Sequence, residues 1–169
     1  MKTMDNVILT TKLTVTDFVK VSFHMFYRKF AIKLLTGIWL FVFLISIPSL
    51  LTRSIVETWT ELLFLIVLVS WLPVYTYFSA KRNYKSNGRI SETIMYEFND
   101  ETITTTGESF SAKLTWDKIY SVTENKDWVL IWQNQQVANV LPKRDFLNED
   151  LKTFKEIVKR QKSFKNKLR

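Results

Sequence analysis

The chain has 169 residues and a formal net charge of +8, and 47% of its residues are hydrophobic. It contains no cysteine, which excludes disulfides, a thiol nucleophile and a thiolate metal site. Its few glycines and prolines and its 15% of aromatic residues are typical of an ordered protein. Much of the hydrophobicity lies in two long apolar runs, so the chain alternates between two kinds of environment.

Residues 1–33 precede the first apolar run and combine a strand-like and a helix-like pattern. Residues 7–13 have the β-branched character of a strand. The stretch from Thr14 to Asp17 resembles a capping box and predicts the start of an amphipathic helix that leads to the apolar run. Our hypothesis is that residues 7–13 add a strand to a sheet formed by the C-terminal residues. The apolar runs would then be inserted into a split domain.

Two charge-free stretches, residues 34–51 and 62–80, are long enough to cross a bilayer as helices. Helices of this length reach roughly 27 Å, close to the thickness of the hydrocarbon layer. The alternative is a pair of buried core helices, but the rest of the chain is too small to enclose both. Neither stretch contains Asp, Glu, Lys, Arg or His in its interior, which argues against a transporter or channel acting alone. We therefore expect a transmembrane hairpin that serves as an anchor.

Cations flank the outer ends of the two stretches, whereas the short connection between them carries a single arginine. Loops rich in Lys and Arg are retained on the cytoplasmic side of a membrane. We therefore expect a multi-pass protein of the cell membrane with both termini cytoplasmic. The flanking cations are Arg28, Lys29 and Lys33 before the first stretch, and Lys81, Arg82 and Lys85 after the second.

Residues 81–169 are predicted to form a cytoplasmic α+β domain. From Arg89 onward the apolar residues alternate with a period of two, which predicts about six short strands in an antiparallel meander. Turns are predicted between strands at residues 99–100, 125–127 and 134–136, each of which begins with asparagine. Trp116 is predicted to anchor the core. Trp128 and Trp132 share one face of a central strand and are predicted to be core residues, although an exposed pair would instead indicate a peptide groove.

A final helix is predicted after the strands, with Asn148 as its N-cap. Apolar residues recur along it at helical spacing, while its other faces carry cations. A sheet followed by one amphipathic helix is the order of a pleckstrin-homology-like (PH-like) domain. The predicted apolar stripe consists of Leu151, Phe154, Ile157, Val158, Gln161 and either Phe164 or Leu168.

This order of features resembles the YcxB-like family of bacterial membrane proteins. The similar stretches are "YEFNDETI" at 96–103, "LTWDKIYSVTENKDWVLIW" at 114–132 and "NVLPKRDF" at 139–146. The resemblance extends over nearly the whole chain. It implies a strand and helix, two spans and then the domain that carries the family name, and it implies no catalytic residues.

Two groups of cations are candidate contacts for anions or lipids. Lys143 and Arg144 follow Pro142, which is expected to end the last strand, so this pair is either a strand-to-helix joint or a site for phospholipid headgroups. The second group lies on the final basic helix and consists of Lys159, Arg160 and Lys162. It is either a solvated helix face or a surface attracted to an anionic leaflet. Nucleic acid is disfavoured because no groove-reading motif accompanies the charge.

No catalytic, metal or cofactor site is predicted. His24 is the single histidine, and with no cysteine present it makes neither a usual zinc site nor a triad. The isolated glycines form no phosphate loop. We therefore expect a non-enzymatic, membrane-anchored interaction module that binds a protein partner, anionic lipid headgroups or both. The alternative is a small accessory subunit of a larger membrane transport or secretion complex. An enzyme is the least favoured interpretation.

Overall fold

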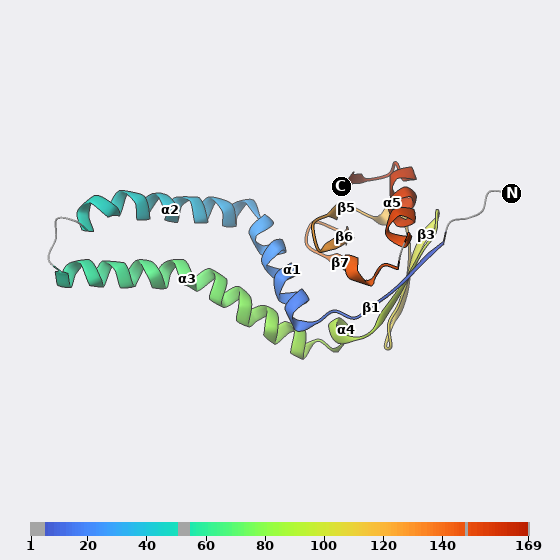
Figure 1. Ribbon diagram of the computed structural model, residues 1–169, viewed down its shortest axis with the longest axis horizontal. Helices are drawn as coiled ribbons and strands as arrows, with labels where there is room; N and C mark the ends of the chain where they lie inside the picture. The colour runs from blue at the N-terminus through green and yellow to red at the C-terminus, as the bar shows by residue number, and fades with distance from the viewer. Residues whose placement is uncertain (1–5, 51–54, 148, 169) are drawn as a thin grey trace. The chain divides into compact units, whose positions relative to one another are not determined.

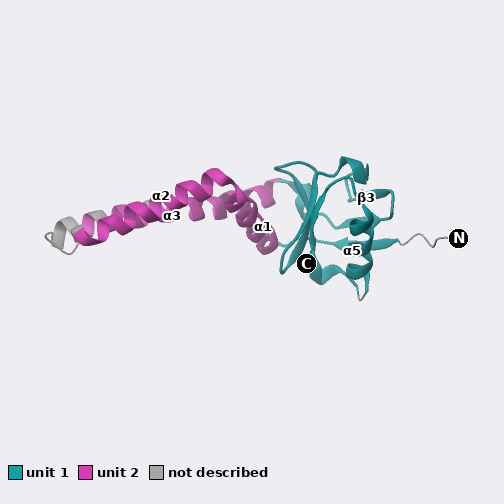
Figure 2. Ribbon diagram, turned by 90° about the horizontal axis from the view of Figure 1, so that it is seen from above, with its two compact units in different colours: residues 1–14, 87–169 teal, residues 15–86 magenta. Residues whose placement is uncertain are grey.

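A computed structural model describes residues 6–50, 55–147 and 149–168. The chain divides into two compact units, one formed by residues 1–14 together with 87–169 and the other by residues 15–86 (Figure 2). This division differs from the boundaries expected from sequence, which were 1–33, 34–80 and 81–169. The first strand belongs with the C-terminal sheet, while the helix after it belongs with the apolar helices.

The helical unit consists of α1 (Val15–Arg28), α2 (Phe30–Leu50) and α3 (Ile55–Ser86). The segments Phe30–Pro48 and Leu62–Ser86 are long and apolar enough to cross a membrane, and few of their side chains are buried. Both expected spans therefore fall within helices, except that residue 51 lies outside the described residues. Pro48 and Pro73 each lie inside a helix, as expected for apolar helices that tolerate proline.

α1 is amphipathic and packs against the C-terminal half of α3. Val21 of α1 and Thr76 and Ala80 of α3 are buried, and the rings of Phe18 and Tyr84 lie 6.0 Å apart. The large apolar side chains of α2 and of the apolar part of α3 are mostly exposed. The unit therefore has one well-packed half and one half whose apolar surface has little protein covering it.

The other unit contains two four-stranded sheets. The first has the order β1-β2-β3-β4, with β1 at Val7–Thr11, β2 at Ile94–Phe98, β3 at Thr102–Thr106 and β4 at Ser111–Thr115. The second has the order β7-β6-β5-β8, with β5 at Ser121–Glu124, β6 at Trp128–Trp132, β7 at Ala138–Pro142 and β8 at Lys165–Lys167. Short helices α4 (Gly88–Ser91), η1 (Trp116–Lys118) and η2 (Lys143–Asp145) and the longer α5 (Asp150–Arg160) complete the unit.

The N-terminal strand pairs with the C-terminal sheet, which confirms the split domain. β1 runs antiparallel to β2, with Val7 opposite Phe98 and Thr11 opposite Ile94. Figure 1 shows β1 running alongside the strands that follow α4. Val7, Leu9 and Thr11 are buried, and the residues between them are exposed, as the period of two requires. The strand ends at Thr11, two residues before the expected end.

Three of the hairpin turns have the same side-chain to backbone hydrogen bonds. The side-chain oxygens of Asn99, Asn125 and Asn134 each accept hydrogen bonds from backbone amides two and three residues later. Asparagine favours such turns because its side chain mimics a backbone acceptor. These are the turns expected between the predicted strands.

A single core joins both sheets and α5. α5 contributes Phe154, Ile157 and Val158, all fully buried, and the ring of Phe154 meets that of Phe98 edge-on at 4.8 Å. Every residue of β6 is buried, which confirms the predicted central strand. The buried core cluster comprises Val7, Leu9, Tyr96, Phe98, Ile103, Trp116, Ile119, Val122, Val129, Ile131, Leu141, Phe154, Ile157 and Val158.

Two sequence predictions about the ends of elements are wrong. The strand expected to include Ile90 begins only at Ile94, because Gly88–Ser91 forms a helical turn. The final helix ends at Arg160, and the chain continues into β8, which pairs in parallel with β5. The sheets are therefore not a purely antiparallel meander.

The end of α5 has a physical cause. The side chain of Gln161 donates to the carbonyl oxygen of Asp100 at 2.9 Å, which attaches the end of the helix to the β2–β3 turn. Phe164 then stacks on Trp116 with ring centroids 5.9 Å apart. Phe164 and Leu168 thus pack against the core as predicted, but from the segment around β8 and not from the helix.

Candidate functional site

The stretch around Lys143 is a joint between β7 and α5, which confirms the structural interpretation of "LPKRDF". Pro142 ends β7, and the backbone amide of Lys143 donates to the carbonyl oxygen of Asp127 at 2.9 Å. η2 then turns the chain, and Phe146 packs its ring 5.5 Å from that of Phe154. The predicted N-cap, Asn148, lies outside the described residues.

Lys143 itself is engaged with a buried carboxylate. Its Nζ lies 2.5 Å from Oε1 of Glu124, and Nζ of Lys155 lies 2.8 Å from the same oxygen. The side chain of Glu124 is 1% exposed, and those of the two lysines are 24% and 21% exposed. A carboxylate this deeply buried requires cationic partners. Lys143 therefore contributes to a cluster that connects β5, η2 and α5.

Glu124 was not singled out by sequence reasoning, although a signal was present. Val122 and Glu124 lie two residues apart on one strand, so the alternation that buries Val122 also directs Glu124 inward. An acid on the inward face of a strand needs a partner. The two lysines that supply it come from segments about 20 and 30 residues further along the chain, which alternation alone does not identify.

Arg144 and Asp145 form a second, more exposed contact. Nε of Arg144 lies 3.4 Å from Oδ1 of Asp145, and the arginine side chain is 54% exposed. Asp145 therefore partly neutralises the charge of Arg144. Asp145 also accepts a short hydrogen bond from the hydroxyl of Thr11, so the joint is attached to the last residue of β1.

The cations of the second group lie at the opposite end of α5. Arg160 binds Oδ1 of Asp100 through its Nη2 at 2.7 Å and its Nε at 2.9 Å. Lys159 and Lys162 are exposed. An 11-residue helix is about 16 Å long, so the five candidates are two separate groups and not one cluster.

The three tryptophans of the domain are core residues. Trp116 is 2% exposed and donates its indole N–H to the carbonyl oxygen of Asn99 at 2.8 Å. Trp128 and Trp132 are 7% and 1% exposed, so the alternative of a groove lined by an exposed tryptophan pair is wrong.

Titratable side chains elsewhere form structural contacts. Hydrogen bonds from the hydroxyl and the backbone amide of Ser109 hold the pKa of Glu92 below its ordinary value and connect two loops. Partial burial, together with the nearby Arg28, lowers the pKa of His24. Within the ranges that the structure describes, no group of three or more His, Asp or Glu side chains could hold a metal ion.

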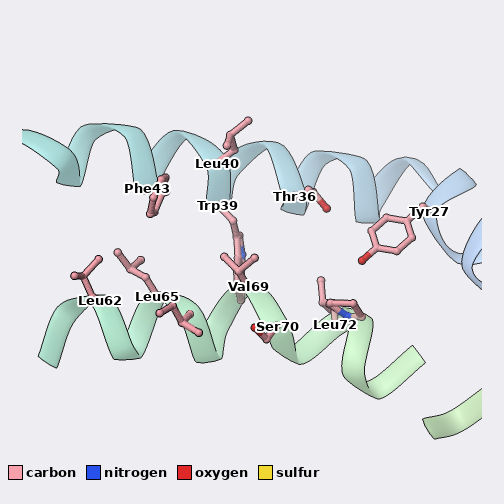
Figure 3. Close-up of a pocket in the computed structure, with 12 residues that line it drawn as sticks. Tyr27, Thr36, Trp39, Leu40, Phe43, Leu62, Leu65, Val69, Ser70 and Leu72 are labelled. Atoms are coloured by element: carbon pink, nitrogen blue, oxygen red, sulfur yellow. The ribbon is translucent and has the colours of Figure 1, made fainter. Parts of the chain in front are cut away.

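An apolar groove lies between α2 and α3. Its volume is about 490 Å³, and Figure 3 shows Trp39 and Phe43 of α2 pointing toward α3 across it. Its polar lining groups include Thr36 and Ser70, whose small side chains would let another helix or a lipid chain approach closely. The full lining consists of Tyr27, Thr36, Trp39, Leu40, Phe43, Leu62, Leu65, Ile66, Val69, Ser70, Leu72 and Pro73.

Comparison with known proteins gives a match to a family model. No curated protein and no solved structure matches the chain. The model of the family described as YcxB-like protein matches residues 98–158, which run from the end of β2 to the buried Val158 of α5. The match includes β3 to β7, the β7–α5 joint and most of α5. The resemblance noted in the sequence is thereby confirmed for residues 98–158.

Proposed function

We propose that this protein is a membrane-anchored, non-enzymatic interaction module. In this proposal α2 and α3 cross the membrane as a hairpin and hold a PH-like domain at the cytoplasmic face. The domain binds a protein partner, anionic lipid or both. The observation that carries the proposal is the pairing of Thr11 with Ile94, since the strand before the helices lies beside the strand after them. Both connections to the helical unit leave the sheet at neighbouring positions, so the domain is attached at two points.

The surface of the helical unit supports membrane insertion. The apolar side chains of α2 and α3 are exposed in large numbers, and in water such a surface would associate or aggregate. The cations at the outer ends of the spans support cytoplasmic termini. The PH-like assignment is supported by two sheets that share a core with one C-terminal amphipathic helix.

The charges of the domain indicate where an anionic partner would bind. Lys143, Lys155 and Arg160 are each bound to carboxylates, which leaves less of their charge available to a ligand. Lys159 and Lys162 are exposed at the end of α5 and are the better candidates for contact. Of the five cations identified from sequence, these two form the surface on which the proposal rests.

Orientation can be tested with single cysteines, because the natural chain has none. We expect a membrane-impermeant maleimide to label Thr52→Cys in intact cells and Ser111→Cys only after the cells are opened. Labelling of both positions, or of Ser111→Cys alone, in intact cells would contradict cytoplasmic termini.

Binding can be tested with a photo-crosslinking residue placed in the full-length protein. We expect crosslinked adducts from positions Lys159 and Lys162 in native membranes. We expect none from Lys113, an exposed cation on β4 of the first sheet. Equal yields at all three positions would indicate random collision and would remove the proposed surface.

The second candidate is an accessory subunit of a larger membrane complex. The groove between α2 and α3 favours it, because a helix of a partner could occupy that space. A crosslinking residue at Phe43 would then give a protein adduct, and replacing both spans with an unrelated hairpin would abolish it. Adducts confined to the end of α5 would favour the interaction module instead.

A further inference from the structure

α3 has two opposite faces in its C-terminal half. One face carries Thr76, Ala80 and Tyr84, which lie toward α1. The opposite face carries residues at spacings of three and four, which a helix brings to one side. These residues are Val74 and Phe78, which are 48% and 63% exposed, followed by Lys81, Arg82 and Lys85. An apolar stripe therefore runs directly into a cationic one.

The cationic part forms a shallow depression. It has a volume of about 510 Å³ and is lined by Phe78, Lys81, Arg82, Lys85 and Ser86. Nζ of Lys81 lies 5.8 Å from the centre of the Tyr77 ring, a position that holds this ammonium group near the apolar stripe. The depression is thus bordered by Phe78 at one end and by cations along its length.

These three cations differ from Lys143 and Arg160 of the domain in their surroundings. Among the residues that the structure describes, no carboxylate forms an ion pair with Lys81, Arg82 or Lys85, and α3 has no acid after Glu61. In the domain, by contrast, Lys143 and Arg160 are paired with Glu124 and Asp100. The charge on α3 is therefore available to an external anion.

We infer that this face of α3 binds one anionic phospholipid. Lys81, Arg82 and Lys85 hold its phosphate and headgroup, and an acyl chain lies along Phe78 and Val74. Arginine and lysine donors suit phosphate oxygens, and an apolar stripe one helical turn away suits a chain attached to that phosphate. A soluble phosphate would not use the stripe. The inference rests on the proposed membrane anchoring.

The test uses the full-length protein in nanodiscs that contain phosphatidylcholine and phosphatidylglycerol, with bound lipids measured by native mass spectrometry. The site variant is Lys81→Gln/Arg82→Gln/Lys85→Gln. The matched control is Lys12→Gln/Lys113→Gln/Lys126→Gln, which removes three exposed cations from the other unit, away from the ends of the spans. A third variant, Lys81→Arg/Lys85→Arg, keeps the charge.

We expect wild type, the matched control and the charge-keeping variant to retain phosphatidylglycerol in preference to phosphatidylcholine. Each cation near an anionic headgroup contributes about fivefold in affinity, so the site variant should lose selectivity on the order of a hundredfold. Phe78→Ala should lower retention of both lipids because it removes part of the apolar stripe.

Three results would overturn the inference. These are no lipid selectivity in wild type, equal losses in the site variant and the matched control, and displacement of the lipid by free inorganic phosphate. The last would identify a phosphate site without a lipid component. Failure of the protein to enter nanodiscs would refute the proposed anchoring itself, and with it the inference.

Discussion

The clearest prediction concerns the strand that precedes the helices. Residues 87–169 alone lack β1, whereas a second fragment joins residues 6–14 to residue 87 through a short Gly/Ser linker. The linker is feasible because Thr11 and Ile94 lie opposite each other in the sheet. We expect the linked fragment to fold and the unlinked fragment to be severely destabilised.

The magnitude follows from what β1 buries. Val7 and Leu9 are 1% and 2% exposed, and full burial of such side chains stabilises a fold by about 1.5–3 kcal/mol each. Together they contribute about 3–6 kcal/mol, an upper estimate because unfolded chains already bury some apolar surface. The domain as a whole should have a free energy of unfolding of about 5–15 kcal/mol. Loss of β1 therefore removes a large part of it and leaves the backbone of β2 without partners on one side.

The assay is amide hydrogen exchange of both fragments, supported by urea unfolding. The linked fragment should protect the amides of β2, and the unlinked one should exchange them rapidly. Within the linked fragment, Leu9→Ala should lower the free energy of unfolding by about 2–5 kcal/mol, whereas Ile8→Ala, at a position 54% exposed, should change it little. Full protection of β2 in residues 87–169 alone would refute the reasoning.

Three further predictions concern polar groups of the domain. Glu124→Gln should lower the free energy of unfolding by about 1–3 kcal/mol, because two partly exposed lysines lose their shared buried carboxylate. The measurement is urea unfolding, with the exposed Glu149→Gln as the control. An effect of Glu124→Gln no larger than that of Glu149→Gln would contradict this prediction. Burial raises the pKa of Tyr96 to about 12. Above pH 10 the unfolded state loses this proton first, so stability should fall by about 2–3 kcal/mol between pH 10 and 12, and Tyr96→Phe should lack this contribution. Trp116→Phe should lower the free energy of unfolding by about 1–3 kcal/mol, because the carbonyl oxygen of Asn99 loses its indole donor. Unfolding followed by circular dichroism measures this change. An unchanged unfolding midpoint would count against that hydrogen bond.

The elements predicted correctly are those with a strong local pattern. β6 is apolar on both faces, and the three asparagine turns mark the hairpin ends, so both are legible within a few residues. β1 required one further step, since a lone strand must find a partner and the strands after the spans were the candidates. The pairing of Thr11 with Ile94 shows that this step was sound.

The elements missed are those decided by distant contacts. β8 has three exposed residues, Lys165, Asn166 and Lys167, and therefore no alternation of buried and exposed positions. Its partner β5 lies some forty residues earlier in the sequence. The position of Phe164 is set by the stacking of its ring on Trp116. At helical spacing the same apolar residues continue the stripe of α5, so the local pattern favoured a helix that the tertiary contacts end at Arg160.

The candidate anion contacts show the same limit most clearly. "PKRDF" and "SAKRNYK" both present adjacent cations in the sequence, and neither stretch reveals whether its charge is already compensated. Whether a cation is neutralised depends on a carboxylate that folding brings close to it. Glu124 forms ion pairs with Lys143 and Lys155, and Asp100 forms one with Arg160. α3 after Glu61 offers no such carboxylate, and its cations follow an apolar stripe. A search for lipid or phosphate contacts in this protein should therefore begin with cations that no carboxylate of the described residues pairs with, and this criterion favours Lys81, Arg82 and Lys85 over Lys143.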